Sequence, residues 1–406
     1  MSQVRDTYTR WAVVASGEGG GRIASQFFTR SDNPGIDDRI LVMNTNRADI
    51  RNTISHMESN FAEGEDPSQH ALEFGSQQGA GNFFVTGMEA AREDLDRIVG
   101  NIGDLATEGG NVDAFLHAAT LGGGTGNGSI PYVIDQFKSG LDTDRRKNWM
   151  DSTIHTAFAV WPYYYEAPQR QFNAVAGLSR LIRSPDGSQN ADMVLLAANS
   201  HLSDDDATGT DYSEVNEQII SAIDLMIGAG RETRGVIDVQ DYVTIPSQIG
   251  AYHFTPAVAT DLNGGMFELE YMFDKAAENA FVPMDVGTSR VTYAVVRAPE
   301  HMIESGDITE PDVQNAFNQW KREHGLLGAS GMTSLTPKQE RGDSVDVLLL
   351  LGGFDLDPLL DHSWEEFEEY KESLQSGRSL GNARLPADEL RRIEDNLTEY
   401  MEINEG

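Results

Sequence analysis

Four polar or glycine-rich segments in the first 170 residues have residue types that could bind a phosphorylated ligand. The densest, Gly122–Ser129 (G-G-G-T-G-N-G-S), follows an apolar run and has five glycines in eight positions. Each glycine in an ordered segment costs about 1 kcal/mol of chain entropy relative to alanine. That cost is offset if backbone N–H groups and the Thr125 hydroxyl surround an anion, so this loop predicts a phosphate-binding site.

Three further segments could contribute to the same site. Gly17–Arg22 follows an apolar run and precedes a helical pattern, which suits either a phosphate-binding turn or an ordinary tight strand-to-helix turn. Gly79–Asn82 (G-A-G-N) also precedes a helical pattern. In Pro162–Arg170, Glu166 has the chemistry to bind a sugar hydroxyl and Arg170 has the chemistry to bind a phosphate.

The familiar nucleotide-binding and zinc-binding patterns are absent. The sequence has no G-x-x-x-x-G-K-S/T, which argues against a Walker P-loop. A dinucleotide-binding Rossmann site needs an acid near the end of its second strand, where this chain has Asn44, Thr45 and Asn46. The nine histidines form no H-x-H or H-E-x-x-H pattern, so no metal site is predicted. We expect His117 and His155 to be core residues.

The elements that would position these loops alternate between strands and helices. Apolar runs predict buried strands at residues 11–16, 40–43, 114–120, 154–161 and 193–198. Helical spacing predicts helices at 23–28, 84–99, 130–137 and 172–182, and residues 51–82 read as a loop-rich insertion. This alternation predicts an α/β fold with a Rossmann-like parallel sheet covered on both faces, whose loops meet at one edge.

The pattern changes after a long helix predicted at 214–227. That helix is apolar on most sides and is expected to be buried between two domains. Strands at 290–297 and 345–351, with a helix at 311–324, predict a second, smaller α/β domain. The expected boundaries are 1–212 for the first domain, 213–235 for the central helix, 236–356 for the second domain and 357–406 for an acidic tail. The tail predicts two amphipathic helices, and Trp364 and Phe367 are expected to pack on the second domain.

Composition excludes several classes of protein. The 406 residues include 65 Asp and Glu against 30 Lys and Arg, a net charge of −35, which argues against binding nucleic acid or an anionic membrane. No apolar stretch is long enough to cross a membrane and no apolar signal core begins the chain, so a cytoplasmic protein is expected. The absence of cysteine excludes disulfides and thiol chemistry. An acidic surface with only six lysines favours a halophilic host, the alternative being a merely acidic protein.

The set of loops resembles the tubulin/FtsZ family of GTPases. Gly122–Gly128 matches the signature G-G-G-T-G-S/T-G with Asn127 as the one change, and 44–46 lies where FtsZ has N-T-D. The segment 79–81 matches its G-A-G loop, and 162–170 matches P-F-x-F-E-G-x-x-R at the proline, glutamate and arginine. The resemblance covers residues 11–356, with motif matches in the first 245, and is closest to divergent archaeal FtsZ-like or CetZ-like proteins.

The resemblance implies a GTP or GDP site with Mg²⁺ held mainly through the nucleotide. Glu166 would bind ribose, Arg170 would lie near the phosphates, Asn199 and Asn216 would read guanine, and Tyr212 would stack on the base. The full set of implied nucleotide-binding residues is Gly17, Glu18, Gly19, Gly20, Gly21, Asn44, Gly79, Ala80, Gly81, Gly122, Gly123, Gly124, Thr125, Gly126, Asn127, Glu166, Arg170, Asn199, Tyr212 and Asn216.

Hydrolysis in this family requires a second subunit, whose carboxylates position the attacking water. FtsZ has N-V-D-F-A-D in that loop, and residues 236–241 of this chain read V-I-D-V-Q-D, so the resemblance makes Asp238 and Asp241 the catalytic pair. The alternative is that Asp238 caps a helix and Asp241 completes a capping box. Glu18 replaces a glutamine found in tubulin and CetZ proteins, and Val236 replaces the asparagine, so both bear on the hydrolysis rate.

Three functions remain open at this stage. The first is a GTP-hydrolysing subunit that assembles head to tail with itself or with other tubulin-family subunits, acting in cell shape or division. The second is a GTP-dependent scaffold or regulator that hydrolyses weakly or not at all. The third is an unrelated nucleotide-using oxidoreductase, which tightly bound NAD would reveal. None of these involves nucleic acid or membrane insertion.

Overall fold

The computed structural model describes most of the chain. The described residues are 9–27, 35–36, 39–58, 61, 66–76, 78–107, 110–142, 146–202, 212–230, 237–265, 268–338, 342–376 and 385–404. Val236 and the side chain of Tyr212, both singled out in the sequence, lie outside this description.

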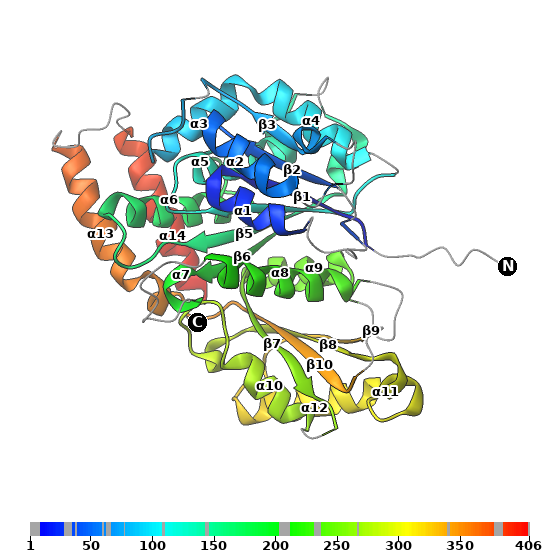
Figure 1. Cartoon of the computed structure of the whole chain (residues 1–406). Helices are drawn as coiled ribbons and strands as arrows, with labels where there is room; N and C mark the ends of the chain where they lie inside the picture. Colours follow the sequence, from blue (N-terminus) through cyan, green and yellow to red (C-terminus); the bar gives the residue numbers. More distant parts are fainter. Residues whose placement is uncertain are drawn as a thin grey trace.

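One ten-stranded sheet runs through the molecule in the order β3-β2-β1-β4-β5-β6-β7-β10-β8-β9 (Figure 1). Its first seven strands in that order are parallel, and β10 is antiparallel to both β7 and β8. The strands are β1 (Trp11–Ser16), β2 (Ile40–Asn44), β3 (Ala71–Glu73), β4 (Ala114–Thr120), β5 (Ile154–Trp161), β6 (Met193–Ala198), β7 (His253–Asn263), β8 (Val291–Pro299), β9 (Thr333–Lys338) and β10 (Ser344–Gly352).

Helices cover both faces of this sheet. They are α1 (Gly17–Phe27), α2 (Arg47–Glu58), α3 (Phe84–Glu93), α4 (Leu95–Thr107), α5 (Thr125–Asp135), α6 (Pro168–Ile182), α7 (Asn199–Leu202), α8 (Tyr212–Gly228), α9 (Val239–Ile249), α10 (Leu269–Ala277), α11 (Glu300–Ser305), α12 (Glu310–Glu323), α13 (Asp357–Gln375) and α14 (Ala387–Asn404). Short helical turns are η1 (Pro67–His70), η2 (Gln136–Gly140), η3 (Asn148–Asp151) and η4 (Val286–Thr288).

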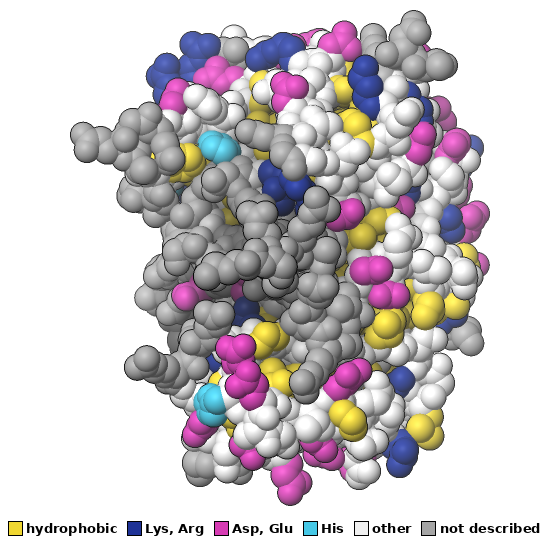
Figure 2. All heavy atoms as spheres, turned by 90° about the vertical axis from the view of Figure 1, so that its right-hand side faces the viewer, with side chains coloured by type: hydrophobic (Ala, Val, Ile, Leu, Met, Phe, Trp, Pro, Cys, Tyr) yellow, Lys and Arg dark blue, Asp and Glu magenta, His cyan; other side chains and the backbone are white. Residues whose placement is uncertain are grey.

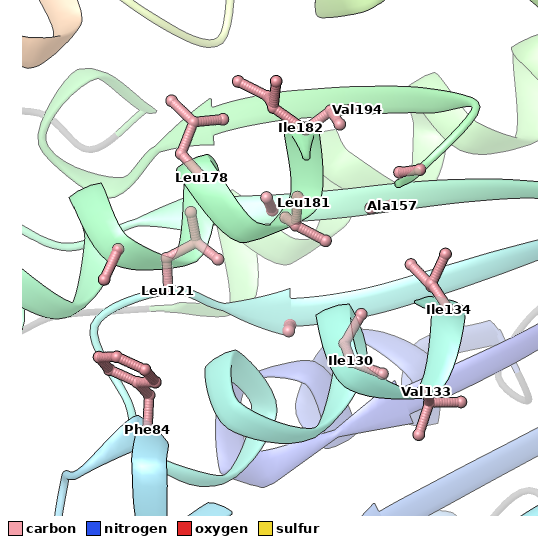
Figure 3. Packing of buried hydrophobic residues seen from close by; sticks show 14 of the residues in the cluster. Phe84, Leu121, Ile130, Val133, Ile134, Ala157, Leu178, Leu181, Ile182 and Val194 are labelled. Carbon is pink, nitrogen blue, oxygen red and sulfur yellow. The ribbon is translucent and has the colours of Figure 1, made fainter. Parts of the chain in front are cut away.

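Two apolar layers hold the first six strands between their helices. Alternate residues of a strand point to opposite faces, so Val14 joins the layer beneath α3 to α6 while Val13 joins the layer beneath α1, α2 and α8. Figure 3 shows the first layer, in which side chains of α5 and α6 meet those of β5 and β6. A third apolar cluster lies between α10, α12 and strands β7 to β10.

The predicted strands of the first half are confirmed, whereas two regions differ from expectation. Residues 51–82 are not a loop-rich insertion, because α2 continues to Glu58 and β3 adds an edge strand. The helix expected at 84–99 is divided at Asp94 into α3 and α4. In the second half, the strands near 291 and 345 are confirmed, the helix considered after Asp238 is α9, and β7, β9, α10 and α11 were not foreseen.

The two tail helices pack on the first half of the molecule, so the expectation that Trp364 and Phe367 pack on the second domain is wrong. The rings of Phe172 on α6 and Phe367 on α13 stack with centroids 5.1 Å apart. Ser363 of α13 accepts a hydrogen bond from Trp161 Nε1 at 2.8 Å. The Ser179 hydroxyl of α6 donates to the carbonyl of Ile393 in α14 at 2.8 Å.

The surface of the described residues is strongly charged. On the face in Figure 2, carboxylate side chains are dispersed and Lys and Arg side chains lie among them. Within the described ranges, every helix is too short or too polar to cross a membrane.

Candidate functional site

A cavity of about 540 Å³ opens where β1, β4, β5 and β6 end, between the loops that the sequence singled out. Its volume is within the range usual for small-molecule sites. Sixteen of the expected nucleotide-binding residues line it. They are Gly17, Glu18, Gly19, Asn44, Gly79, Ala80, Gly81, Gly122, Gly123, Gly124, Thr125, Gly126, Glu166, Arg170, Asn199 and Asn216.

Two helix N-termini converge on this cavity. Helix α1 begins at Gly17, directly after β1, and α5 begins at Thr125 after the glycine-rich loop. The N-cap residue of α5 is Gly124, which has no side chain that could accept hydrogen bonds from the first N–H groups of the helix. Such groups, together with the positive end of the helix dipole, form a favourable environment for a phosphate.

Glycine lets the two helix starts approach each other. Gly17 has φ +78°, and a Cβ built there would lie 3.0 Å from the backbone nitrogen of Gly126. A Cβ on Gly126 would lie 2.4 Å from the carbonyl oxygen of Ser16. Gly128 is equally crowded, with the carbonyl oxygen of Phe84 at 2.2 Å, whereas Gly123 has room for a side chain. Backbone packing therefore requires several glycines of this loop, independently of any bound anion.

Buried polar side chains fix the floor of the cavity. The hydroxyls of Thr45 and Thr125 are 2.7 Å apart and share a hydrogen bond. Asn44 is 2% exposed, and its Oδ1 accepts from the backbone N–H of Asn46 at 3.0 Å. The hydrogen bond between Thr45 and Thr125 holds the start of α2 in a fixed position next to the start of α5.

An acidic pair and one arginine lie at the side of the cavity formed by α1 and α2. Glu18 and Arg22 form an ion pair at 2.5 Å, and both side chains are about half exposed. Burial, with repulsion from Glu18, raises the pKa of Asp49, and Arg22 opposes this shift. This side of the cavity therefore carries more negative than positive charge.

Glu166 and Arg170 are joined to each other on the opposite side. Their side chains form an ion pair at 2.8 Å, and Glu166 also accepts from the backbone N–H of Tyr163 at 3.0 Å. Arg170 is 41% exposed against 16% for Glu166, so the arginine is the more accessible partner. At the far end of the cavity, Asn199 and Asn216 are both 8% exposed and line the wall.

Three expected residues do not reach the cavity wall. Gly20 packs against the carbonyl of Ala118 and Gly21 against Val42. Asn127 is fully buried, and its amide donates to the carbonyls of Leu121 and Asn173 at 2.6 Å each. Since a motif match does not distinguish backbone packing from ligand contact, these three were included with the loops that hold them. The side chain of Tyr212 lies outside the described residues.

The cavity also contains residues that the sequence reading missed. They are Ile23, Asp49, Gln78, Thr120 and Val160, besides Arg22, Asn46, Asn82 and Pro162, which belong to the quoted segments but were given no role in binding. Asn82 has φ +61°, and its carbonyl accepts from Gln169 and Asn173 of α6 at 2.8 and 2.7 Å. Asp49 could have been found from its position just after a predicted parallel strand, had α2 been recognised.

Asp238 and Asp241 lie at the start of α9, away from this cavity. Asp238 Oδ1 accepts from the backbone N–H groups of Gln240 at 2.8 Å and Asp241 at 3.0 Å. Asp241 Oδ2 accepts from the backbone N–H of Asp238 at 3.0 Å, which completes a capping box. The second oxygen of each carboxylate has no hydrogen bond to the part of the chain that is described.

The described residues bring no three His, Asp or Glu side chains together to hold a metal ion. His117 and His155 are buried and hydrogen-bonded to each other at 3.0 Å, as expected of core residues. Burial lowers the pKa of both imidazoles, that of His155 to about 3. Among the described residues, the carboxylates that line the cavity are those of Glu18, Asp49 and Glu166, and the last is paired with Arg170.

Comparison with known proteins gives one family and one fold. Residues 10–205 match the GTPase domain of the Tubulin/FtsZ family. The tubulin-like protein CetZ1 of Haloferax volcanii is 24% identical over 59% of this chain and 55% of its own length. The tubulin-like protein CetZ of Pyrococcus abyssi is 22% identical over 98% of both chains.

Solved structures of such proteins have the same fold. The GDP-bound CetZ1 monomer of Haloferax volcanii gives a TM-score of 0.70 at 19% identity and covers 89% of this chain and 100% of its own. The GTPγS-bound CetZ2 protofilament of the same organism gives 0.65 at 17% identity, covering 91% and 100%.

Proposed function

Residues 10–205 of this chain belong to the Tubulin/FtsZ family, and from this premise we propose a GTP-binding protein that assembles head to tail and hydrolyses GTP between subunits. The role would be cytoskeletal, in cell shape or division, in the cytoplasm of a halophilic archaeon. Relatives solved as a GDP-bound monomer and as a GTPγS-bound protofilament support both the nucleotide and the assembly.

The cavity supplies the chemistry that nucleotide binding needs. The N-termini of α1 and α5 would hold the phosphates through backbone N–H groups. Asn199 and Asn216 present amides that can donate and accept, as recognition of a guanine edge requires. Mg²⁺ arriving with the phosphates would reduce their repulsion with Glu18 and Asp49.

One observation carries the proposal that a second subunit completes the site: the cavity and the Asp238–Asp241 pair lie at opposite ends of α8. Asn216, near the beginning of α8, lines the cavity. At the other end, Ile237 donates to the carbonyl of Ala229 at 3.1 Å and the Tyr242 hydroxyl donates to that of Met226 at 3.2 Å. Ten or more residues at 1.5 Å per residue separate these positions by roughly 15–20 Å.

Within one chain, the carboxylates cannot reach a nucleotide in the cavity across this distance. A neighbour stacked along the direction of α8 would bring its own α9 to the open cavity, and repetition of that contact makes a filament (Figure 1). The carboxylate oxygens of Asp238 and Asp241 that take no part in the capping box would then accept hydrogen bonds from the attacking water and orient it.

A second candidate is a scaffold that binds GTP but hydrolyses it weakly or not at all. The capping box favours it, because it gives both aspartates a structural role that needs no catalysis. Glu18 favours it too, because its charge opposes that of the phosphates.

GTP turnover per subunit, measured against protein concentration in molar KCl with Mg²⁺, distinguishes the two. For interface hydrolysis, turnover per subunit rises with concentration in the wild type. Asp238→Asn and Asp241→Asn keep an oxygen that can cap the helix but remove the charge, so we expect turnover to fall about 100-fold or more while nucleotide binding persists.

Asp285→Asn is the matched control, since Asp285 also caps a helical turn through its side chain and lies outside both sites. It should leave turnover unchanged. Flat, near-zero turnover in a wild type that still binds GTP would establish the scaffold instead. Wild-type turnover in both asparagine variants would show that the two aspartates serve only as caps.

A further inference from the structure

A second cavity of about 400 Å³ lies at the other end of α5 and α6, and it shares no lining residue with the first. The first cavity contacts the N-terminal turns of both helices, whereas this one contacts their C-terminal turns. Helices α3 and α14 complete its walls, and Figure 1 shows α14 lying beside α6.

Four arginines line this second cavity. They are Arg92 of α3, Arg180 of α6, Arg183 directly after α6, and Arg392 of α14. Only two carboxylates, those of Asp135 and Glu389, line it with them. The whole chain has 30 basic residues and a net charge of −35, so a cavity lined by more arginines than carboxylates differs from the overall excess of acidic residues.

The partners of these arginines leave positive charge unpaired. Arg392 pairs with Glu389. Arg180 donates to the carbonyls of Asn127 and Gly128 at 3.0 and 3.2 Å, and its guanidinium lies over the Phe84 ring. Among the described residues, no carboxylate comes within ion-pair distance of Arg180. Burial of its guanidinium disfavours the charged form and lowers the pKa of Arg180 to about 10.

The other two arginines, Arg92 and Arg183, also have positive charge that no nearby carboxylate of the described residues balances. Arg92 lies 5.7 Å from the centroid of the Tyr132 ring, and Arg183 donates weakly to the carbonyl of Gly187 at 3.4 Å. Neither forms an ion pair with a carboxylate in the described ranges. Attraction to the C-terminal dipole of a helix accounts for arginines in the last turns of α3 and α6, but not for Arg392, which is near the beginning of α14.

A buried amide oxygen adds a second polar feature. Asn190 lines the cavity, and its amide nitrogen donates to the carbonyls of Pro131 and Arg180 at 2.9 and 2.7 Å. Its Oδ1 is buried and has no hydrogen-bond partner among the described atoms. Such an acceptor suits a ligand that also carries a hydroxyl, as hydroxycarboxylates and hydrogen phosphate do.

We propose that this cavity, formed by α3, α5, α6 and α14, binds a small polyvalent oxyanion, a hydroxycarboxylate or a phosphate. Arginine forms paired, charge-assisted hydrogen bonds with both groups. The bound anion links α14 to α3 and α6, so it also stabilises the docked position of α14. This proposal is independent of the nucleotide bound in the first cavity.

The test is calorimetric titration of the full chain with citrate, and separately with inorganic phosphate, at constant ionic strength in magnesium-free KCl. We expect one citrate per chain, with an affinity that excess GDP does not alter. Arg183→Gln and Arg392→Gln should each weaken citrate binding about tenfold or more, since each removes one charged hydrogen-bond donor pair. If both phosphate and citrate bind, the ligands of this cavity include phosphoryl compounds. If only citrate binds, its ligands are carboxylates.

Arg391→Gln is the matched control, because Arg391 is the exposed neighbour of Arg392 on the same helix and does not line the cavity. It should bind citrate as the wild type does. The proposal is overturned if neither anion binds, if GDP displaces the anion, or if Arg391→Gln weakens binding as much as Arg392→Gln. Melting temperatures establish that each variant is folded. If one of the two site variants does not fold, the other alone tests the proposal.

Discussion

Glu18 is one of the residues of the cavity whose charge opposes the proposed ligand. Its carboxylate lines the wall beside the N-terminus of α1, where an anion would otherwise be favoured. Two like charges 4 Å apart repel by about 1 kcal/mol in water and by about 4 kcal/mol at the effective dielectric of a protein surface. The ion pair with Arg22 compensates part of this cost, and a divalent cation would compensate more.

Replacing Glu18 with glutamine should therefore tighten nucleotide binding, most of all when Mg²⁺ is absent. For Glu18→Gln we expect GDP affinity to rise about three- to tenfold in EDTA, and by less in millimolar Mg²⁺. Competition with a fluorescent GDP analogue measures both conditions. Glu89→Gln, an exposed acid of α3 outside the cavity, is the control. Weaker binding of GDP by Glu18→Gln in EDTA would mean that the carboxylate assists the ligand directly.

At the scale of elements, α14 is part of the first core and not a detachable tail. Its Tyr400 is fully buried, and the hydroxyl accepts from the backbone N–H groups of Tyr252 and His253, both at 3.2 Å. The same hydroxyl lies 2.8 Å from Nδ1 of His253, whose Nε2 lies 2.8 Å from the carbonyl of Phe354. A neutral imidazole fits this arrangement, with Nε2–H donating to the carbonyl and Nδ1 accepting from the tyrosine.

Two measurements of stability test this contact. Tyr400→Phe should lower the free energy of unfolding by about 1–3 kcal/mol, because it leaves three buried groups without a partner. Tyr370→Phe, whose hydroxyl has no hydrogen bond within the described ranges, should change it by less than about 0.5 kcal/mol. Equal effects in urea unfolding at pH 7 would exclude a special role for Tyr400.

The burial of His253 in this contact predicts that the stability of the fold depends on pH. Burial lowers the pKa of His253 from 6.5 to about 4. Between these values the unfolded chain binds a proton that the folded chain does not, so stability is full above pH 6.5 and falls as pH decreases toward 4. At pH 5 this one group accounts for a loss of about 2 kcal/mol.

The sequence predicted the elements with continuous apolar runs and missed those with mixed patterns. β1, β4, β5 and β6 are buried on both faces, so their apolar runs have clear limits. β7 begins with His253 and ends in exposed polar residues, which conceals it. The loops of the cavity were predicted from glycine and motif spacing, but Gln78 and Asp49 carry no such pattern. The docking of α14 depends on contacts more than 140 residues apart, which periodicity cannot show.

At the scale of the whole molecule, the charge of −35 is the dominant property. On the face in Figure 2, the carboxylates are dispersed and not gathered into one patch, so on this face their repulsion is not confined to one site. Salt at molar concentration shortens the screening length to about 3 Å, which nearly abolishes repulsion between surface groups farther apart.

We therefore expect the melting temperature to rise by more than about 10 °C between 0.2 and 2 M KCl. Calorimetric or fluorescence melting at neutral pH measures it, and sucrose at matched osmolality should not reproduce the effect if screening is the cause. Equal melting temperatures at low and molar KCl would contradict adaptation to high salt and leave the acidity without this explanation.

The junction of β6 and β7 makes the bending stiffness of the sheet uneven. Only two residue pairs, Val194 with His253 and Leu195 with Phe254, join these strands, fewer than at any other junction of the sheet. Beyond them, β6 is held by the Thr255 hydroxyl and by the carbonyl of Phe281. A force that pulls the two halves apart concentrates its strain at this junction. Because β6 leads directly into Asn199, strain at this junction would also act on that wall of the cavity.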